Sequence, residues 1–299
     1  MNSLKNNNLI KSASYASVIV AIIILTAKIY GWLATESQSM LASLIDSMLD
    51  ISSSVINLIA IRVSLLPPDD NHRFGHEKFQ DLAIFSQAAF FFASCLFTMF
   101  SSTKVLFLGS TLSNSEFGID IMYLCTVLTF ALVSYQSYVV KKTNSKIIAA
   151  DKLHYFADLL TNIAVIISLY VSGKYWYIDP VLGIFISLYI MSASYKLFMQ
   201  SIKNLADEEF PQSDKNKILQ VISKYKQIQG LHDLKTRYAG NKPFIQFHVE
   251  LDPEMTLLDA HEITDDIMEE LIKIFPGAEI IVHQDPAGID EVVQYREQL

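Results

Sequence analysis

The stretch DKLHYFADLLTNIAVIISLY, residues 151–170, decides how this chain is organised. Its second half is apolar enough to lie in a membrane, whereas its first half carries Asp151, His154 and Asp158. Ionisable side chains are costly at membrane depth, and they usually face the interior of a helix bundle and serve a function. The stretch therefore predicts a membrane helix that brings an imidazole and a carboxylate, four residues apart, into the protein interior.

The composition of the whole chain is typical of a polytopic membrane protein. Of its 299 residues, 51% are hydrophobic and only 18% are charged, with a mean hydropathy of +0.30. A soluble protein of this length carries more charge.

The net charge of −8, without a run of Lys and Arg, does not suggest a nucleic-acid partner. Cys95 and Cys125 lie in apolar segments of the sequence and are expected to be small core residues. The N-terminus lacks a small-residue cleavage site, so we expect no cleaved signal peptide.

Apolar stretches long enough to cross a bilayer, which takes about 20 residues, are concentrated in the first two thirds of the chain. Polar segments such as PPDDNHRFGHEK and KKTNSK separate them. The expected spans cover residues 12–34, 40–65, 80–108, 119–140, 147–172 and 178–203. We therefore predict a polytopic α-helical protein, with a six-helix transmembrane domain over residues 1–206 and a second domain over residues 207–299.

The distribution of basic residues predicts the orientation in the membrane. They gather in the N-terminal tail and around the second and fourth loops, at Lys5, Lys11, Arg62, Arg73, Lys78, Lys141, Lys142 and Lys146. The first and third loops have none, and the fifth has only Lys174. Because cytoplasmic loops carry the excess of Lys and Arg, we expect both termini and the second domain to be cytoplasmic.

The second domain reads as helix, strand, strand, helix, strand. Apolar residues of 212–227 follow a helical period, and Ile245, Phe247, Val249 and Leu251 alternate with polar residues as in a strand. Thr256 and Asp259 resemble the capping box of a helix that runs to about residue 274, and AEIIVHQD follows as a short strand. This order predicts a small α+β sandwich with both helices on one face of the sheet.

Two pairs of ionisable residues in different spans point to a metal site. Asp46 and Asp50 in LIDSMLDIS have the same spacing as His154 and Asp158. Four residues turn a helix by about 400° and rise about 6 Å, so each pair lies on one face. On facing helices they offer three carboxylates and one imidazole, a set that suits a tetrahedral divalent cation, zinc above all. The alternative is a polar helix interface, satisfied by Ser, Thr and Asn hydrogen bonds.

The remaining histidines fall into two further groups. Asp69, His72 and His76 lie in the loop DDNHRFGHEK, where Gly75 permits a tight turn; they form either a second metal site or a solvated loop. The second domain carries His232, His248, His261 and His283, with Asp285 two residues after the last of them. Unrelated surface histidines are the alternative there. All seven histidines of the chain fall into these three groups, which uniform scatter does not explain.

These motifs together resemble a known family. LIDSMLDI, DDNHRFGHEK, LHYFAD, HDLKTR, FIQFHVEL and VHQDP are similar to the corresponding segments of the cation diffusion facilitators, in particular of bacterial zinc and ferrous-iron efflux transporters. The resemblance covers nearly the whole chain. It implies a protein of the bacterial inner membrane, a cytoplasmic domain of metallochaperone-like α-β-β-α-β fold, and a homodimer paired through that domain.

The resemblance also implies roles for individual residues. Asp46, Asp50, His154 and Asp158 would form the transport site, and Asp69, His72 and His76 a loop site. A binuclear cytoplasmic site would take the ligands His232, His248, His261, His283 and Asp285, the last bridging two ions. Lys78, Asp207 and Arg237 match a charge interlock, and Leu153 matches a hydrophobic gate. The retained His154 favours zinc, because members that prefer manganese tend to have aspartate there.

The function expected from these observations is export of Zn²⁺ in exchange for protons, with Fe²⁺, Cd²⁺ and Co²⁺ as further substrates. No GxxxxGK[ST] motif for ATP occurs, so an ion gradient is the expected drive. No cofactor is expected, and the cation serves as substrate and as a structural or regulatory ion. The expected partners are a second copy, the lipid bilayer, metal ions and protons. A membrane-bound metalloenzyme would need an identifiable general base, and a metal sensor would not need ligands inside the bilayer.

Overall fold

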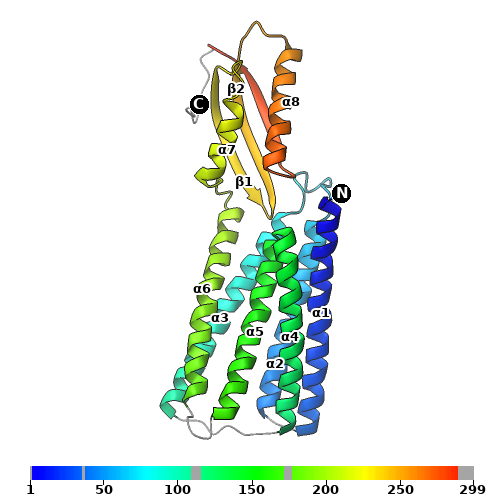
Figure 1. The fold of residues 1–299 in the computed structure, drawn as a ribbon, viewed down its shortest axis with the longest axis vertical. Coiled ribbons are helices and arrows are strands. Elements are labelled where there is room, and N and C mark those ends of the chain that lie inside the picture. Colours follow the sequence, from blue (N-terminus) through cyan, green and yellow to red (C-terminus); the bar gives the residue numbers. More distant parts are fainter. Residues whose placement is uncertain (1, 36–37, 109–115, 172–176, 289–299) are drawn as a thin grey trace. The chain divides into compact units, whose positions relative to one another are not determined.

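The computed structural model describes residues 2–35, 38–108, 116–171 and 177–288, and some side chains within the helices, among them that of Asp46, lie outside the description. The chain divides into two compact units, Met1–Ile202 and Lys203–Leu299, and each is described by itself. Figure 1 shows long helices in the first unit and a small sheet with two helices in the second.

The first unit is built from six long helices. They are α1 (Asn2–Thr35), α2 (Gln38–Ser64), α3 (Lys78–Leu108), α4 (Glu116–Thr143), α5 (Lys146–Val171) and α6 (Ile178–Leu205). Among the described residues, four helical segments are long and apolar enough to cross a membrane: Asn6–Gly31, Lys78–Phe107, Asp120–Thr143 and Pro180–Leu205. The other two helices, α2 and α5, carry ionisable side chains within their apolar stretches, such as Asp50 on α2 and Asp151 and Asp158 on α5. The predicted fold class is confirmed, while six crossings remain a prediction.

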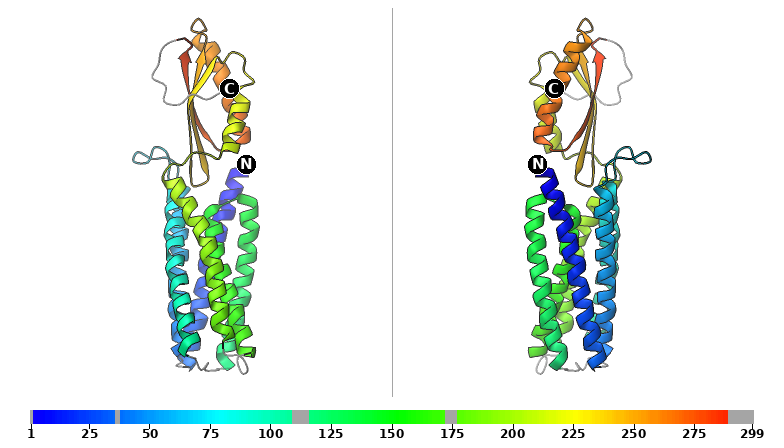
Figure 2. Two further views of the ribbon diagram at one scale, coloured as in Figure 1. Left: turned by 90° about the vertical axis from the view of Figure 1, so that its left-hand side faces the viewer. Right: turned by 90° about the vertical axis from the view of Figure 1, so that its right-hand side faces the viewer.

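The helices of the first unit run lengthwise beside one another (Figures 1 and 2). Helix α1 packs against α2 and α4, and α5 packs against α4 and α3. Small and branched apolar residues form the shared core of these helices, at the end of the bundle where α5 begins. They are Ala13, Ala60, Ile61, Ala83, Ile84, Val139, Ile147, Ile148 and Ala150. Large apolar side chains remain exposed around the outside, including Phe97, Phe100 and Phe130. Such a surface is unfavourable in water, and a bilayer would cover it.

The second unit has the predicted order of elements: α7 (Gln212–Ile222), β1 (Gly230–Ala239), β2 (Lys242–Leu251), α8 (Leu257–Ile274) and β3 (Glu279–Pro286). Strands β1 and β2 form an antiparallel hairpin, and β3 joins β2 in parallel. Figure 2 shows both helices on one face of the sheet. The alternating residues of β2 that are apolar, such as Phe247 and Val249, are buried against these helices together with Ile218 and Ile267.

Three local features of the second unit bear on the predicted elements. Thr256 caps α8 by accepting a hydrogen bond from the backbone N–H of Asp259, as the sequence predicts. Strand β1 has an irregularity between His232 and Lys235, where Asp233 has a φ of +52°. The predicted helix over 212–227 is too long: α7 ends at Ile222, because the following residues bond in short turns that lead into β1.

Candidate metal-binding sites

The first cluster lies where α2 and α5 face each other. His154 Nε2 is 3.1 Å from Asp50 Oδ1 and 3.7 Å from Asp158 Oδ2. One ligand atom from each of these three residues lies within 4.8 Å of the other two. His154 is buried, whereas the two carboxylates are partly exposed. The spacing of four residues on α5 and the approach of α2 together produce this grouping.

The orientation of His154 leaves its Nε2 directed toward the two carboxylates. Its Nε2 is buried without a well-aligned hydrogen bond, although it faces two carboxylates. The ring is held by Phe91 of α3, which stacks on it at 5.1 Å between centroids, and by an edge-on contact with Tyr155. A buried nitrogen without a well-aligned hydrogen bond is costly. A cation bound between Nε2 and the two carboxylates would satisfy it.

Two residues predicted for this region lie outside what the structure tests. Asp46 is one helical turn before Asp50 on α2, and its side chain lies outside the described part of the structure. The structure therefore brings three of the four predicted ligands together. Leu153 is half-buried beside His154, and its predicted gating role remains a prediction.

The second cluster occupies the loop between α2 and α3. Asp69 Oδ1 is 3.2 Å from His72 Nδ1, and Asp69 Oδ2 is 3.3 Å from His76 Nε2. The same carboxylate accepts hydrogen bonds from the backbone N–H groups of Asn71 and His72. The hydrogen bond from the His72 backbone is the main cause that lowers the pKa of Asp69, so this carboxylate stays ionised. Gly75, with a φ of +90°, makes the turn that returns His76 to Asp69.

The third cluster is a row of histidines across the sheet of the second unit. His232, His248 and His283 are register partners on β1, β2 and β3. Adjacent rings lie 4.9 and 4.5 Å apart, measured between centroids. Direct register partners point to the same face of a sheet. The row is on the face opposite the helices, because the neighbouring residues Phe247 and Val249 point into the core.

Asp285 connects the members of this row. Its Oδ2 lies 2.8 Å from His248 Nδ1 and 3.3 Å from His232 Nε2, whereas its Oδ1 lies 3.2 Å from His283 Nε2. One oxygen of the carboxylate thus faces two imidazoles, and the other oxygen faces one. A carboxylate placed in this way could contact a cation with each of its two oxygens.

The structure does not bring His261 to this row within one chain. His261 lies on α8, is 62% exposed and pairs with Asp265 at 3.3 Å. The reason is the alternation of β3: Gln284, between His283 and Asp285, donates hydrogen bonds to Ala260 and Thr264 of α8. The side of β3 that faces α8 is therefore not the side that carries His283.

One acidic neighbour of the row is not among the predicted ligands. Glu250 Oε1 lies 3.9 Å from His232 Nε2, and Glu250 is the register partner of Asp285. Its position two residues after His248 places it on the same face of β2. The spacing of two residues therefore already indicates in the sequence that Glu250 and His248 share a strand face.

Asp207 and Arg237, two of the three residues of the predicted charge interlock, lie in the same unit and form an ion pair. Arg237 Nη1 donates to both carboxylate oxygens of Asp207, at 3.2 and 3.3 Å. Lys78 is the first residue of α3 and belongs to the other unit. The three-residue interlock therefore remains a prediction.

Comparison with known proteins agrees with this description. Residues 14–206 match the family described as "Cation efflux transmembrane domain", and residues 210–287 match the one described as "Cation efflux protein, cytoplasmic domain". The chain therefore belongs to the cation efflux family, the cation diffusion facilitators, and is a membrane transporter. The predicted family resemblance is confirmed.

Individual relatives cover the chain almost completely. "Protein p34" of Rickettsia rickettsii is 56% identical over 299 residues, which is 100% of this chain and 99% of the relative. The "Cation-efflux pump FieF" of Shewanella oneidensis is 39% identical over 286 residues, 95% of this chain and 97% of the relative. Among solved structures, the metal-bound C-terminal domain of the CzcD transporter from Thermotoga maritima is 30% identical, covering 27% of this chain and 94% of that chain, with a TM-score of 0.26.

Proposed function

We propose that this transporter exports divalent metal cations from the cytoplasm in exchange for protons, with Zn²⁺ ahead of Fe²⁺, Cd²⁺ and Co²⁺. The observation that carries the proposal is the convergence of Asp50, His154 and Asp158 around the buried Nε2 of His154. A mixed nitrogen and oxygen set is one that Zn²⁺ accepts. Asp46, on the same face of α2 as Asp50, would be the fourth ligand.

The chemistry of this ligand set supports exchange with protons. Carboxylates and imidazole bind a cation only in their deprotonated forms, so binding releases protons and protonation releases the cation. The proton gradient across the membrane would therefore drive the cation outward.

We further propose the bacterial inner membrane as the location, with six membrane crossings and both termini in the cytoplasm. The positions of the basic residues support this orientation. In this arrangement residues 1–206 form the transport domain. The loop cluster of Asp69, His72 and His76 would then lie on the cytoplasmic side, where it would bind cations before transport.

Residues 207–299 would form a cytoplasmic metal-binding domain that pairs two copies of the chain. His232, His248, His283 and Asp285 would hold two ions on the open face of the sheet. Ile281, half-exposed two residues before His283, gives the same face an apolar contact surface. His261 belongs to this proposal as a ligand contributed between two copies, since it lies apart from the row within one chain.

Cation uptake by the purified full-length protein in sealed lipid vesicles tests the proposal. An acidic lumen should drive Zn²⁺ into the vesicles while the lumen becomes more alkaline, and Asp50→Asn should abolish both signals. Vesicles without protein, and vesicles whose pH gradient has been collapsed by an ionophore, are the controls. Zn²⁺ uptake that is unaffected by the pH gradient would contradict antiport, and equal uptake by Asp50→Asn would contradict the transport site.

A further inference from the structure

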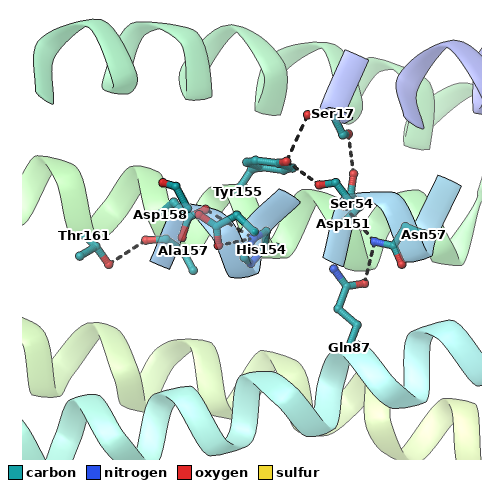
Figure 3. Close-up of polar contacts among 12 residues, drawn as sticks. Ser17, Ser54, Asn57, Gln87, Asp151, His154, Tyr155, Ala157, Asp158 and Thr161 are labelled. Carbon is teal, nitrogen blue, oxygen red and sulfur yellow. Dashed lines mark hydrogen bonds and ion pairs between the residues drawn. The ribbon is translucent and has the colours of Figure 1, made fainter. Parts of the chain in front are cut away.

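A second ionisable group lies in the transport domain close to His154 but outside its ligand cluster. Asp151 is on α5, one turn before His154, and is only 2% exposed. Its carboxylate accepts three hydrogen bonds from three other helices: from Ser17 Oγ of α1 at 2.6 Å, from Asn57 Nδ2 of α2 at 3.0 Å and from Gln136 Nε2 of α4 at 2.7 Å. Figure 3 shows Asp151 between Ser17 and Asn57.

The side chains that donate hydrogen bonds to Asp151 are polar but uncharged. Asn57 also contacts Gln87 of α3 at 3.3 Å, so the side chains that face the carboxylate network from α1, α2, α3 and α4 are a hydroxyl and three amides. The titratable groups that interact with it electrostatically, His154 and Tyr155, are both on α5. A Lys or Arg partner would keep a buried carboxylate ionised permanently, whereas hydroxyl and amide partners do not.

Two of the partners have a second hydrogen-bond arrangement available. The Ser17 hydroxyl carries one proton and lies both 2.6 Å from Asp151 and 3.1 Å from the carbonyl oxygen of Ala13. Gln136 places Nε2 against Asp151 while its Oε1 is buried without a partner. If Asp151 gains a proton, the hydroxyl can turn to Ala13 and the amide can turn over, so that Gln136 Oε1 or Ser17 Oγ accepts the new O–H. Either protonation state of Asp151 can thus be satisfied.

This network is joined to the proposed cation ligands. Tyr155 donates to the backbone carbonyl of Ser17 at 3.3 Å and shares a 2.6 Å hydrogen bond with Ser54, while its ring contacts that of His154 (Figure 3). Asp151 and His154 are about 4.5 Å apart along the axis of α5. A divalent cation beside His154 would favour the ionised carboxylate, and a proton on Asp151 would disfavour the cation.

We propose that Asp151 is a proton-binding site, separate from the cation ligands, whose proton leaves when the cation binds and returns when the cation is released. The assignment rests on the proposed antiport function and adds a residue to it. Asp151 carries one of the exchanged protons, Ser17 and Gln136 adapt to its two states, and the cation itself never contacts it.

The test measures proton release on Zn²⁺ binding and proton-driven Zn²⁺ flux in the full-length protein. Asp151→Asn, which cannot ionise, should bind Zn²⁺ more weakly than the wild type at high pH, with an affinity that depends less on pH, and should release fewer protons per ion, by about one at most. Its flux should lose most of the acceleration by an acidic lumen. Asp120→Asn makes the same change at an exposed position of α4 and should behave as the wild type.

A second variant separates proton binding from a purely structural role. Gln136→Leu keeps Asp151 but removes a donor to its carboxylate, which disfavours the ionised form, so the pH dependence of flux should move to higher pH between about pH 5.5 and 8. An unchanged pH profile and unchanged proton release in both variants would overturn the assignment. If Asp151→Asn does not fold, the direction of the Gln136→Leu shift decides alone. Wild-type protein that shows no proton-coupled flux would instead refute the proposed function.

Discussion

The cluster in the membrane helices and the cluster on the sheet use the same kinds of side chain in opposite settings. Asp50, His154 and Asp158 come from two helices, and their grouping depends on how α2 and α5 face each other. The row of His232, His248 and His283 is set by register within a single sheet. A change in helix packing would therefore dismantle the first cluster, whereas the second persists as long as the sheet is intact.

This difference suits the two proposed roles. A site that must bind and release a cation on opposite sides of a membrane benefits from ligands on separate helices, which can move relative to one another. A site that stabilises a pair of domains benefits from ligands held in fixed register by backbone hydrogen bonds. The two clusters contain the same types of ligand, so the proposed difference in role rests on the elements that carry them.

Loss of one carboxylate of the membrane cluster should have the largest effect. Asp158→Ala should reduce Zn²⁺ flux by more than about 100-fold, since even the outer partners of metal ligands are worth about 10–100-fold. Stabilisation of the second unit by Zn²⁺ should remain unchanged. Vesicle uptake and metal-dependent thermal unfolding measure the two properties on the same preparation, with expression and insertion as controls. Loss of both properties would remove the distinction between the two clusters.

Changing the imidazole of the membrane cluster should alter selectivity. His154→Asp would give a shell of oxygen ligands only, which suits Mn²⁺ better than the mixed set does. The ratio of initial rates for Zn²⁺ and Mn²⁺ should fall by about tenfold, and the pH profile should change between about pH 5.5 and 8, the range that brackets the ordinary histidine pKa. A variant with the wild-type ratio and profile would show that His154 does not select the cation.

Removing histidines of the sheet row should reduce the stabilisation of the protein by Zn²⁺ more than it reduces Zn²⁺ flux. With His232→Ala and His283→Ala combined, Zn²⁺ should lose most of its effect on thermal unfolding and on pairing of the chain. A ligand at about 100 times its Kd stabilises by about 2.7 kcal/mol, so the loss is measurable by calorimetry. His261→Ala is the informative control: it should weaken pairing at limiting Zn²⁺ but leave metal binding by a separated single chain intact. Equal losses in both measurements would place His261 within the row.

The smallest effect is expected at a surface ion pair that belongs to neither cluster. Lys224 Nζ donates to Glu270 at 2.5 Å, and this hydrogen bond is the main cause that lowers the pKa of Glu270. Because the folded pKa lies below the unfolded value, the pair stabilises the fold at neutral pH, and this stabilisation is lost as pH falls through the acidic range. Lys224→Met should therefore lower the melting temperature slightly near pH 7 and not at about pH 3. A difference that persists at acidic pH would point to lost packing of the Lys224 stem.

Much of the candidate site chemistry could be predicted because it depends on local periodicity. The spacing of four residues places His154 and Asp158 on one helical face whatever surrounds them. The spacing of two places His283 and Asp285 on one strand face in the same way. Gly75 within a short polar loop likewise indicates the turn that groups Asp69 with its histidines.

The misplaced or overlooked features depend on distant parts of the chain. The sequence predicts that His261 lies on a helix. It does not predict which side of β3 packs against that helix, and this decides whether α8 faces the histidine row. Asp151 and Asp158 are both aspartates about one helical turn from His154, Asp151 three residues before it and Asp158 four residues after it. Only its neighbours reveal that it belongs to a separate network.

The sequence by itself determined the family, the order of the elements and the identity of the side chains able to bind a cation, because apolar length, charge distribution and residue spacing are properties of the chain. The tertiary structure decided which of these side chains meet. Ser17, Asn57 and Gln136 are scattered over 120 positions of sequence, and three helices must pack against α5 before they surround one carboxylate. Contacts of this kind arise from the burial of whole helix faces, which no local pattern encodes.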